Sequence, residues 1–94
     1  KHILGHHILH TMIAYFETAI IKDTESAGNS MKRVFFEVAP DRIEIIKLPL
    51  SANNATMQAA CNERLEYLKD RQDKEQQLSD LRQQVAELEN ELGL

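Results

Sequence analysis

Residues 78–92, LSDLRQQVAELENEL, decide the fold of this 94-residue chain. Large apolar side chains recur in this stretch at alternating steps of three and four residues: Leu78, Leu81, Val85, Leu88 and Leu92. That spacing is the a/d pattern of a coiled coil, and one helix cannot bury so narrow an apolar stripe by itself. The stretch therefore predicts that the chain pairs with a second helix, most simply that of another copy.

The helix that carries this stretch should begin much earlier in the chain. Pro49 ends the segment before it, and Ser51, Asn53 or Asn54 can cap its first turn, so we expect a helix from about Asn54 to the end. When the a/d frame is extended backwards, Tyr67 becomes a further predicted interface residue.

Two other parts of the same helix have different patterns. Cys61, Leu65 and Leu68 form an apolar set one residue out of phase with the a/d frame, and we expect this part to pack on a small head. Residues 69–77, KDRQDKEQQ, contain no apolar side chain and predict either a solvated helical span or a loose section of coil.

The first half of the chain predicts a small α+β head. Apolar residues fall at nearly helical spacing from Ile3 to Ile21, which indicates an amphipathic helix over about 3–22. Residues 22–30, KDTESAGNS, have the composition of a loop. Alternating apolar residues then predict strands at about 31–38 and 42–48, joined by a type I turn at Pro40-Asp41, and we expect the first helix to cover this hairpin.

The predicted fold class is therefore α+β: an N-terminal amphipathic helix, a β-hairpin and a long C-terminal helix that forms a coiled coil. We place the head at residues 1–50 and the long helix at 51–94, with the coil strongest from 78 to 92. We expect a parallel dimer that holds matching heads at one end. The flanking g–e′ charges are weakly informative, since Asp70 opposes Glu75 while Gln77 meets Arg82, so an antiparallel or heteromeric coil and a higher oligomer stay open.

Composition excludes several functional classes. The net charge is −4, and residues 51–94 supply all of it, so an acidic helix beside a neutral head disfavours nucleic-acid binding. The apolar runs are shorter than the roughly 20 residues that a membrane crossing needs, which predicts no insertion. A single cysteine, Cys61, allows no intrachain disulfide and favours an intracellular protein, cytoplasmic or nuclear. Because the chain starts without Met and ends in an acidic turn, we expect a piece of a longer protein.

Candidate chemistry is sparse. His2, His6 and His10 are four residues apart, and on a helix such a spacing can hold a transition metal or contact haem. No Cys or second carboxylate completes a ligand set nearby, so a solvent-facing histidine cluster is the preferred interpretation and no cofactor is predicted. The sequence lacks a Ser/His/Asp set, a glycine-rich phosphate loop, HExxH and CxxC, and we therefore predict no enzymatic activity.

The order of helix, hairpin and long helix resembles the last part of the small β-heads on parallel stalks of some DNA-repair and centriolar proteins. It is also similar to the helix–hairpin–helix layout of MADS-type dimers. The first resemblance implies a fuller β-sandwich than one hairpin, and the second implies a basic first helix, which residues 3–21 do not provide. We assign the chain to neither family.

Two functional hypotheses follow from the sequence. The first is a non-enzymatic homodimerisation or scaffold module of a larger structural or adaptor protein, whose coil sets stoichiometry while the paired heads bind another protein. The alternative is a metal- or haem-responsive sensor domain that uses His2, His6 and His10, with the coil transmitting the signal. The sequence does not name the partner or the cellular process.

Overall fold

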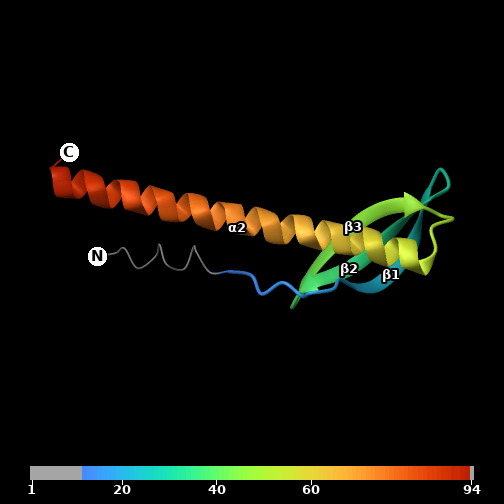
Figure 1. Cartoon of the computed structure of the whole chain (residues 1–94). Coiled ribbons are helices and arrows are strands. Elements are labelled where there is room, and N and C mark those ends of the chain that lie inside the picture. Colours follow the sequence, from blue (N-terminus) through green and yellow to red (C-terminus); the bar gives the residue numbers. More distant parts are fainter. Residues whose placement is uncertain (1–11, 94) are drawn as a thin grey trace. The chain divides into compact units, whose positions relative to one another are not determined.

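The computed structural model describes residues 12–93 (Figure 1). Three strands, β1 (Ile20–Gly28), β2 (Met31–Ala39) and β3 (Arg42–Pro49), precede one long helix, α2 (Asn54–Leu92). The α+β class is therefore confirmed for this part of the chain. Contacts divide it into two units: a compact head, residues 13–68, which holds the sheet and the first turns of α2, and a second unit that contains α2 from Lys69 onward.

The predicted hairpin is present as β2 and β3, with bounds close to those expected. The strands are antiparallel, and Val34 lies opposite Ile46 while Phe35 lies opposite Ile45. The turn between them differs from the predicted type I turn, because Asp41 has a φ of 61°. The ring of Pro40, the residue before Asp41, fixes the φ of Pro40 at a negative value. A negative φ followed by a positive φ at the two central positions is typical of a type II turn. The Asp41 backbone N–H donates to Glu37 Oε2 at 3.0 Å and holds the turn.

Strand β1 occupies residues that were predicted to be the end of a helix and a loop. It pairs antiparallel with β2, and Ile21 lies opposite Phe36 while Thr24 lies opposite Val34. Asn29 and Ser30, with φ values of 52° and 60°, make the connection. Two consecutive positive φ values are typical of a type I′ hairpin turn, whose twist suits antiparallel strands. The loop-like composition of residues 22–30 therefore belongs to a strand and its turn, and the sheet has three strands in the order β1-β2-β3.

The predicted N-terminal helix over about 3–22 is wrong wherever the structure describes it. Residues 1–11 lie outside the described range, residues 12–19 are not helical, and β1 begins at Ile20. The backbone has distant partners instead of the i−4 carbonyls of a helix: Phe16 N–H donates to the Val38 carbonyl at 2.8 Å. Likewise, Ala19 N–H donates to the Asn62 side chain at 2.9 Å. Near-helical apolar spacing was misleading here because Ile21 faces the core from a strand.

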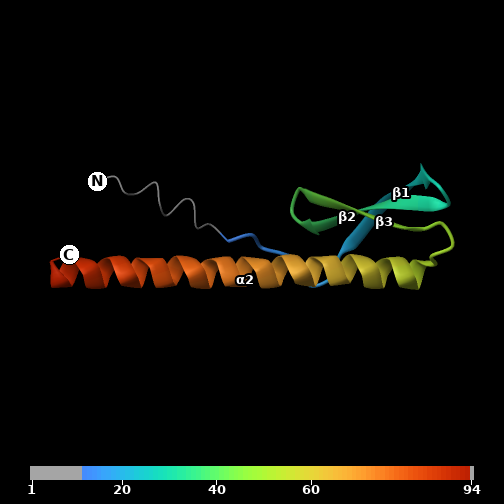
Figure 2. The ribbon, with the colours of Figure 1, turned by 90° about the horizontal axis from the view of Figure 1, so that it is seen from above.

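The core of the head lies between one face of the sheet and the first part of α2, which crosses the sheet in Figure 1 and lies along one side of it in Figure 2. Alternate residues of β2 point to this face, and α2 contributes residues at helical spacing. The buried residues that cluster in this core are Ala19, Val34, Phe36, Val38, Met57, Cys61 and Leu65, with Leu68 packed at the margin. The out-of-phase set on α2 is thus confirmed as the surface that packs on the head. The prediction that the first helix covers the hairpin is wrong, since α2 does so.

The start of α2 follows the predicted chemistry. Asn53 is the cap, and its Oδ1 accepts a hydrogen bond from Thr56 N–H at 2.8 Å. The Asn53 carbonyl accepts the first helical bond, from Met57 N–H at 2.9 Å. A side-chain oxygen at this position satisfies one of the backbone donors that a helix leaves unpaired at its start. Pro49 closes β3, as expected, and only a short connection separates it from Asn53.

Candidate self-association surface on the long helix

The second unit contains α2 from Lys69 to Leu92, and its apolar side chains are solvent-exposed. The leucine ladder, as we call the a/d residues of this unit, has exposed fractions between 46% and 72%. Its members are Leu78, Leu81, Val85, Leu88 and Leu92. The a/d spacing places them on one side of the helix, with successive members about one turn apart. Exposed apolar residues scattered over a surface need no explanation, but a continuous row of them is typical of an interaction surface.

Local sequence explains why this unit is helical throughout. Residues 69–92 are rich in Gln, Leu and Glu, with Lys and Arg among them, and contain neither Gly nor Pro. These residue types lose little side-chain freedom in a helix. The helix ends where Gly93 takes a φ of +76° and its N–H donates to the Asn90 carbonyl at 3.2 Å. A glycine in this left-handed conformation is a common stop, because other residues pay a steric penalty there.

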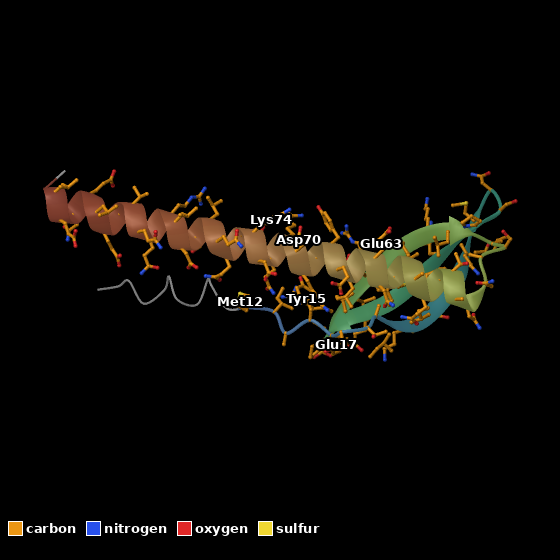
Figure 3. The ribbon with its side chains drawn as sticks, in the orientation of Figure 1. Met12, Tyr15, Glu17, Glu63, Asp70 and Lys74 are labelled. Atoms are coloured by element: carbon orange, nitrogen blue, oxygen red, sulfur yellow. The ribbon has the colours of Figure 1, made fainter. Side chains whose placement is uncertain are left out.

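The a/d positions of this unit that precede the ladder form the first part of the predicted seam between two helices. They are the charged residues Arg71 and Lys74, and each pairs with a carboxylate of the same helix. Lys74 Nζ lies 2.9 Å from Asp70 Oδ2 (Figure 3), and Arg71 Nε lies 3.6 Å from Glu75 Oε2. Both pairs have the i, i+4 spacing that supports an exposed helix by about 0.3–0.5 kcal/mol each. The two cations that occupy a/d positions in this unit, Arg71 and Lys74, are therefore engaged along the helix. The apolar part of the seam begins only at Leu78.

Tyr67, the other predicted interface residue, belongs to the head unit. Its ring is half-exposed and lies under the guanidinium of Arg64, with 5.0 Å from the Arg64 Cζ atom to the ring centroid. Arg64 Nε also lies 3.2 Å from Glu44 Oε1 on β3. Tyr67 is thus held by a cation–π contact at the margin of the head. Its part in an interface stays a prediction.

Cys61 is fully enclosed in the core of the head, and burial raises the pKa of its thiol from 9.0 to about 11. A thiol in that state is a poor nucleophile and a poor metal ligand, because the thiolate is the reactive form. His2, His6 and His10 lie outside the described residues. Within residues 12–93, His, Cys, Asp and Glu side chains form no group of three that could hold a metal ion.

Comparison with known proteins gives no match. No protein-family model, curated protein or solved structure matches the chain. The part of the chain that the structure describes also has no helix long and apolar enough to cross a membrane.

Sequence reasoning missed one further surface, the outer face of the sheet that α2 does not cover. The alternation of β3 showed that Ile43 and Ile45 share a face opposite Glu44. The structure turns Glu44 toward α2 and leaves Ile43 and Ile45 about half-exposed on the outer face. Alternation alone could not decide which face would be buried, because both faces of β3 carry isoleucine.

Proposed function

We propose that the chain is a non-enzymatic self-association module in which the leucine ladder joins two copies of α2 as a coiled coil. The observation that carries this proposal is the row of exposed a/d side chains on an unbroken helix of 39 residues. Knobs-into-holes packing against a second helix is the usual way to bury such a stripe. The contribution of the module is geometric: it fixes how many heads come together.

The strength of the pairing follows from the length of the ladder. Residues 78–92 span only about two heptads, and the seam before them is charged. Short helices are marginal without a partner, and a short coil has little apolar area with which to offset the entropy of association. The proposed dimer is therefore reversible and concentration-dependent.

We favour a parallel arrangement within this proposal. A parallel coil brings the N-terminal ends of the two helices together, and with them the two heads that contain those ends. The paired heads then offer a composite surface to another protein. An antiparallel coil would separate the heads and remove that surface. The orientation of the coil therefore decides whether the paired heads can bind another protein together.

The proposal is tested by light scattering on the full chain and on two charge-matched variants. Leu81→Asp/Leu88→Asp places carboxylates at two d positions of the ladder, while Gln83→Asp/Asn90→Asp adds the same charge at outward f positions. The wild type and the f-position variant are expected to form dimers, and the ladder variant is expected to be monomeric. A ladder variant that stays dimeric at the same concentration would move the interface to the head.

The orientation has its own test. A cysteine added after Leu94 can form a disulfide with its counterpart only when the two C-terminal ends meet, as they do in a parallel coil. Mild oxidation should then give a covalent dimer, and Cys61 does not compete because its thiol is buried. Absence of the covalent dimer, with a normal dimer by light scattering, would favour the antiparallel coil.

A further inference from the structure

Strand β3 forms an open edge of the sheet. The strand order β1-β2-β3 gives β3 a neighbour on one side, and the other side of its backbone pairs with no strand among the described residues. The pairing of β2 with β3 is regular from Met31↔Pro49 to Glu37↔Ile43, and its one register shift lies beside the turn. A long, regular edge strand is a template for pairing with another chain.

The opposite edge, formed by β1, is built differently. Its register shifts twice, between Ile21 and Asp23 and again between Ser26 and Gly28. Bulges of this kind twist an edge away from a flat pairing geometry. Exposed charges along β1, among them Lys22 and Glu25, add to this protection. The sheet is therefore defended against strand addition at β1 and open to it at β3.

The outer face beside the β3 edge presents two apolar residues and a cation in alternate positions. Ile43 and Ile45 are 50% and 52% exposed, and Lys47 follows on the same face. The neighbouring cation, Arg33, is engaged by Glu25 at 3.3 Å. The Lys47 ammonium forms no ion pair with any residue that the structure describes. This row is complementary to an extended segment that carries apolar residues and one carboxylate.

A second copy of β3 fits this edge poorly. When one strand pairs antiparallel with its own copy through the same edge, a two-fold axis normal to the sheet relates the copies, and only residues of the same face can oppose each other. Centring the pair on Glu44 opposes two glutamates, and centring it on Ile45 sets Glu44 against Ile46. Centring on Ile46 sets Glu44 against Leu48. Centring on Ile43 matches Arg42 with Glu44 but overlaps only residues 42–44 of the strand. None of these registers brings Lys47 opposite a carboxylate.

We propose that the β3 edge binds an extended peptide segment of another protein, which adds to the sheet as an antiparallel strand. The segment has the pattern acid–x–apolar–x–apolar from its N-terminus, so that the acid faces Lys47 and the apolar residues face Ile45 and Ile43. Main-chain hydrogen bonds to the free edge supply the affinity, and alternate side chains supply the selectivity. The site is separate from the leucine ladder and does not depend on it.

The charge requirement is tested with a fluorescein-labelled peptide, Thr-Glu-Thr-Val-Thr-Val-Thr, and fluorescence anisotropy on the full chain. Replacing Glu by Lys in the peptide should weaken binding at least about threefold, as should Lys47→Glu in the protein, since exposed pairs are worth up to about 1 kcal/mol. Combining the two changes should restore binding. Lys69→Glu, which alters net charge equally at an outward f position of the other unit, should leave it unchanged.

The strand-addition requirement is tested with two N-methylated forms of the same peptide. In each form alternate backbone N–H groups are blocked, so one form cannot bond to β3 while the other is blocked only on its solvent side. The form that is blocked toward β3 should bind more than about tenfold more weakly than the unmodified peptide, and the form that is blocked toward solvent should keep its binding. Equal binding of both forms overturns the proposal, as does a charge swap without rescue. In the Leu81→Asp/Leu88→Asp variant, which cannot pair through the ladder, concentration-dependent shifts of the β3 amides without peptide would assign the edge to a second copy and overturn the proposal as well.

Discussion

Asn62 and Gln58 on α2 hold the backbone of Ala19, the residue just before β1, and the head should depend on these hydrogen bonds for its stability. Asn62 Oδ1 accepts hydrogen bonds from Ala19 N–H at 2.9 Å and from Gln58 Nε2 at 3.0 Å. Gln58 Nε2 also donates to the Ala19 carbonyl at 2.7 Å. Two amide side chains one turn apart on α2 therefore satisfy both backbone groups of a residue that is only 2% exposed.

Asn62→Ala removes the acceptor and leaves the Ala19 N–H without access to water. An unsatisfied buried donor costs about 1–3 kcal/mol, which corresponds to an increase of about five- to 160-fold in the unfolded population. Asn62→Asp keeps an oxygen in the same place for both donors, so it should recover most of the loss. The order of stability should be wild type, then Asn62→Asp, then Asn62→Ala.

The assay is urea unfolding of the head, followed by circular dichroism and by the amide signals of β2. Asn90→Ala is the matched control, since Asn90 is exposed on the same helix and its carbonyl, not its side chain, bonds to Gly93. The control should change the free energy of unfolding by less than about 0.5 kcal/mol. Equal unfolding of Asn62→Ala and Asn90→Ala, or an aspartate that behaves like alanine, would refute the reasoning.

Three further predictions concern the head. Leu65→Ala should lower the free energy of unfolding by about 2–5 kcal/mol, because Leu65 is fully enclosed; a loss below 1 kcal/mol in the same urea assay would contradict this. Asn53→Ala removes the cap of α2 and should cost about 0.5–2 kcal/mol, measured by the same titration, whereas Asn53→Ser should be nearly neutral. The Cys61 pKa rises on folding, so the folded state binds more protons between pH 9.0 and about 11, and stability should fall across that window. Cys61→Ala should flatten this decline, and an unchanged slope would remove the thiol as its cause.

The long helix and the hairpin of β2 and β3 were predictable because their signals are local. Residues 78–92 carry their own periodicity, and Pro49 and Asn53 mark the boundary before α2 through backbone chemistry that needs no tertiary contact. The change of phase at Cys61 and Leu65 correctly separated the part of the helix that packs on the sheet. Such features are read directly from the order of residues.

Strand β1 was not predictable in the same way. Most of its residues are polar and exposed, so it lacks the apolar alternation of a typical strand, and its pairing with β2 holds it in place. Tertiary hydrogen bonds of this kind override local preference. The signal in the sequence that points to β1 is Gly28-Asn29-Ser30, whose composition is typical of a loop but also suits a tight hairpin turn, which these residues form. With β1 missed, the open edge at β3 and the outer face beside it could not be identified from the sequence.

The central claim is that the leucine ladder joins two copies of the chain, and sedimentation equilibrium tests it most directly. The full chain has a mass of 10.8 kDa. Measured over a range of micromolar concentrations, the average mass should rise with concentration toward twice that value and fit a monomer–dimer equilibrium. A folded chain that sediments at 10.8 kDa over the whole range would contradict the claim.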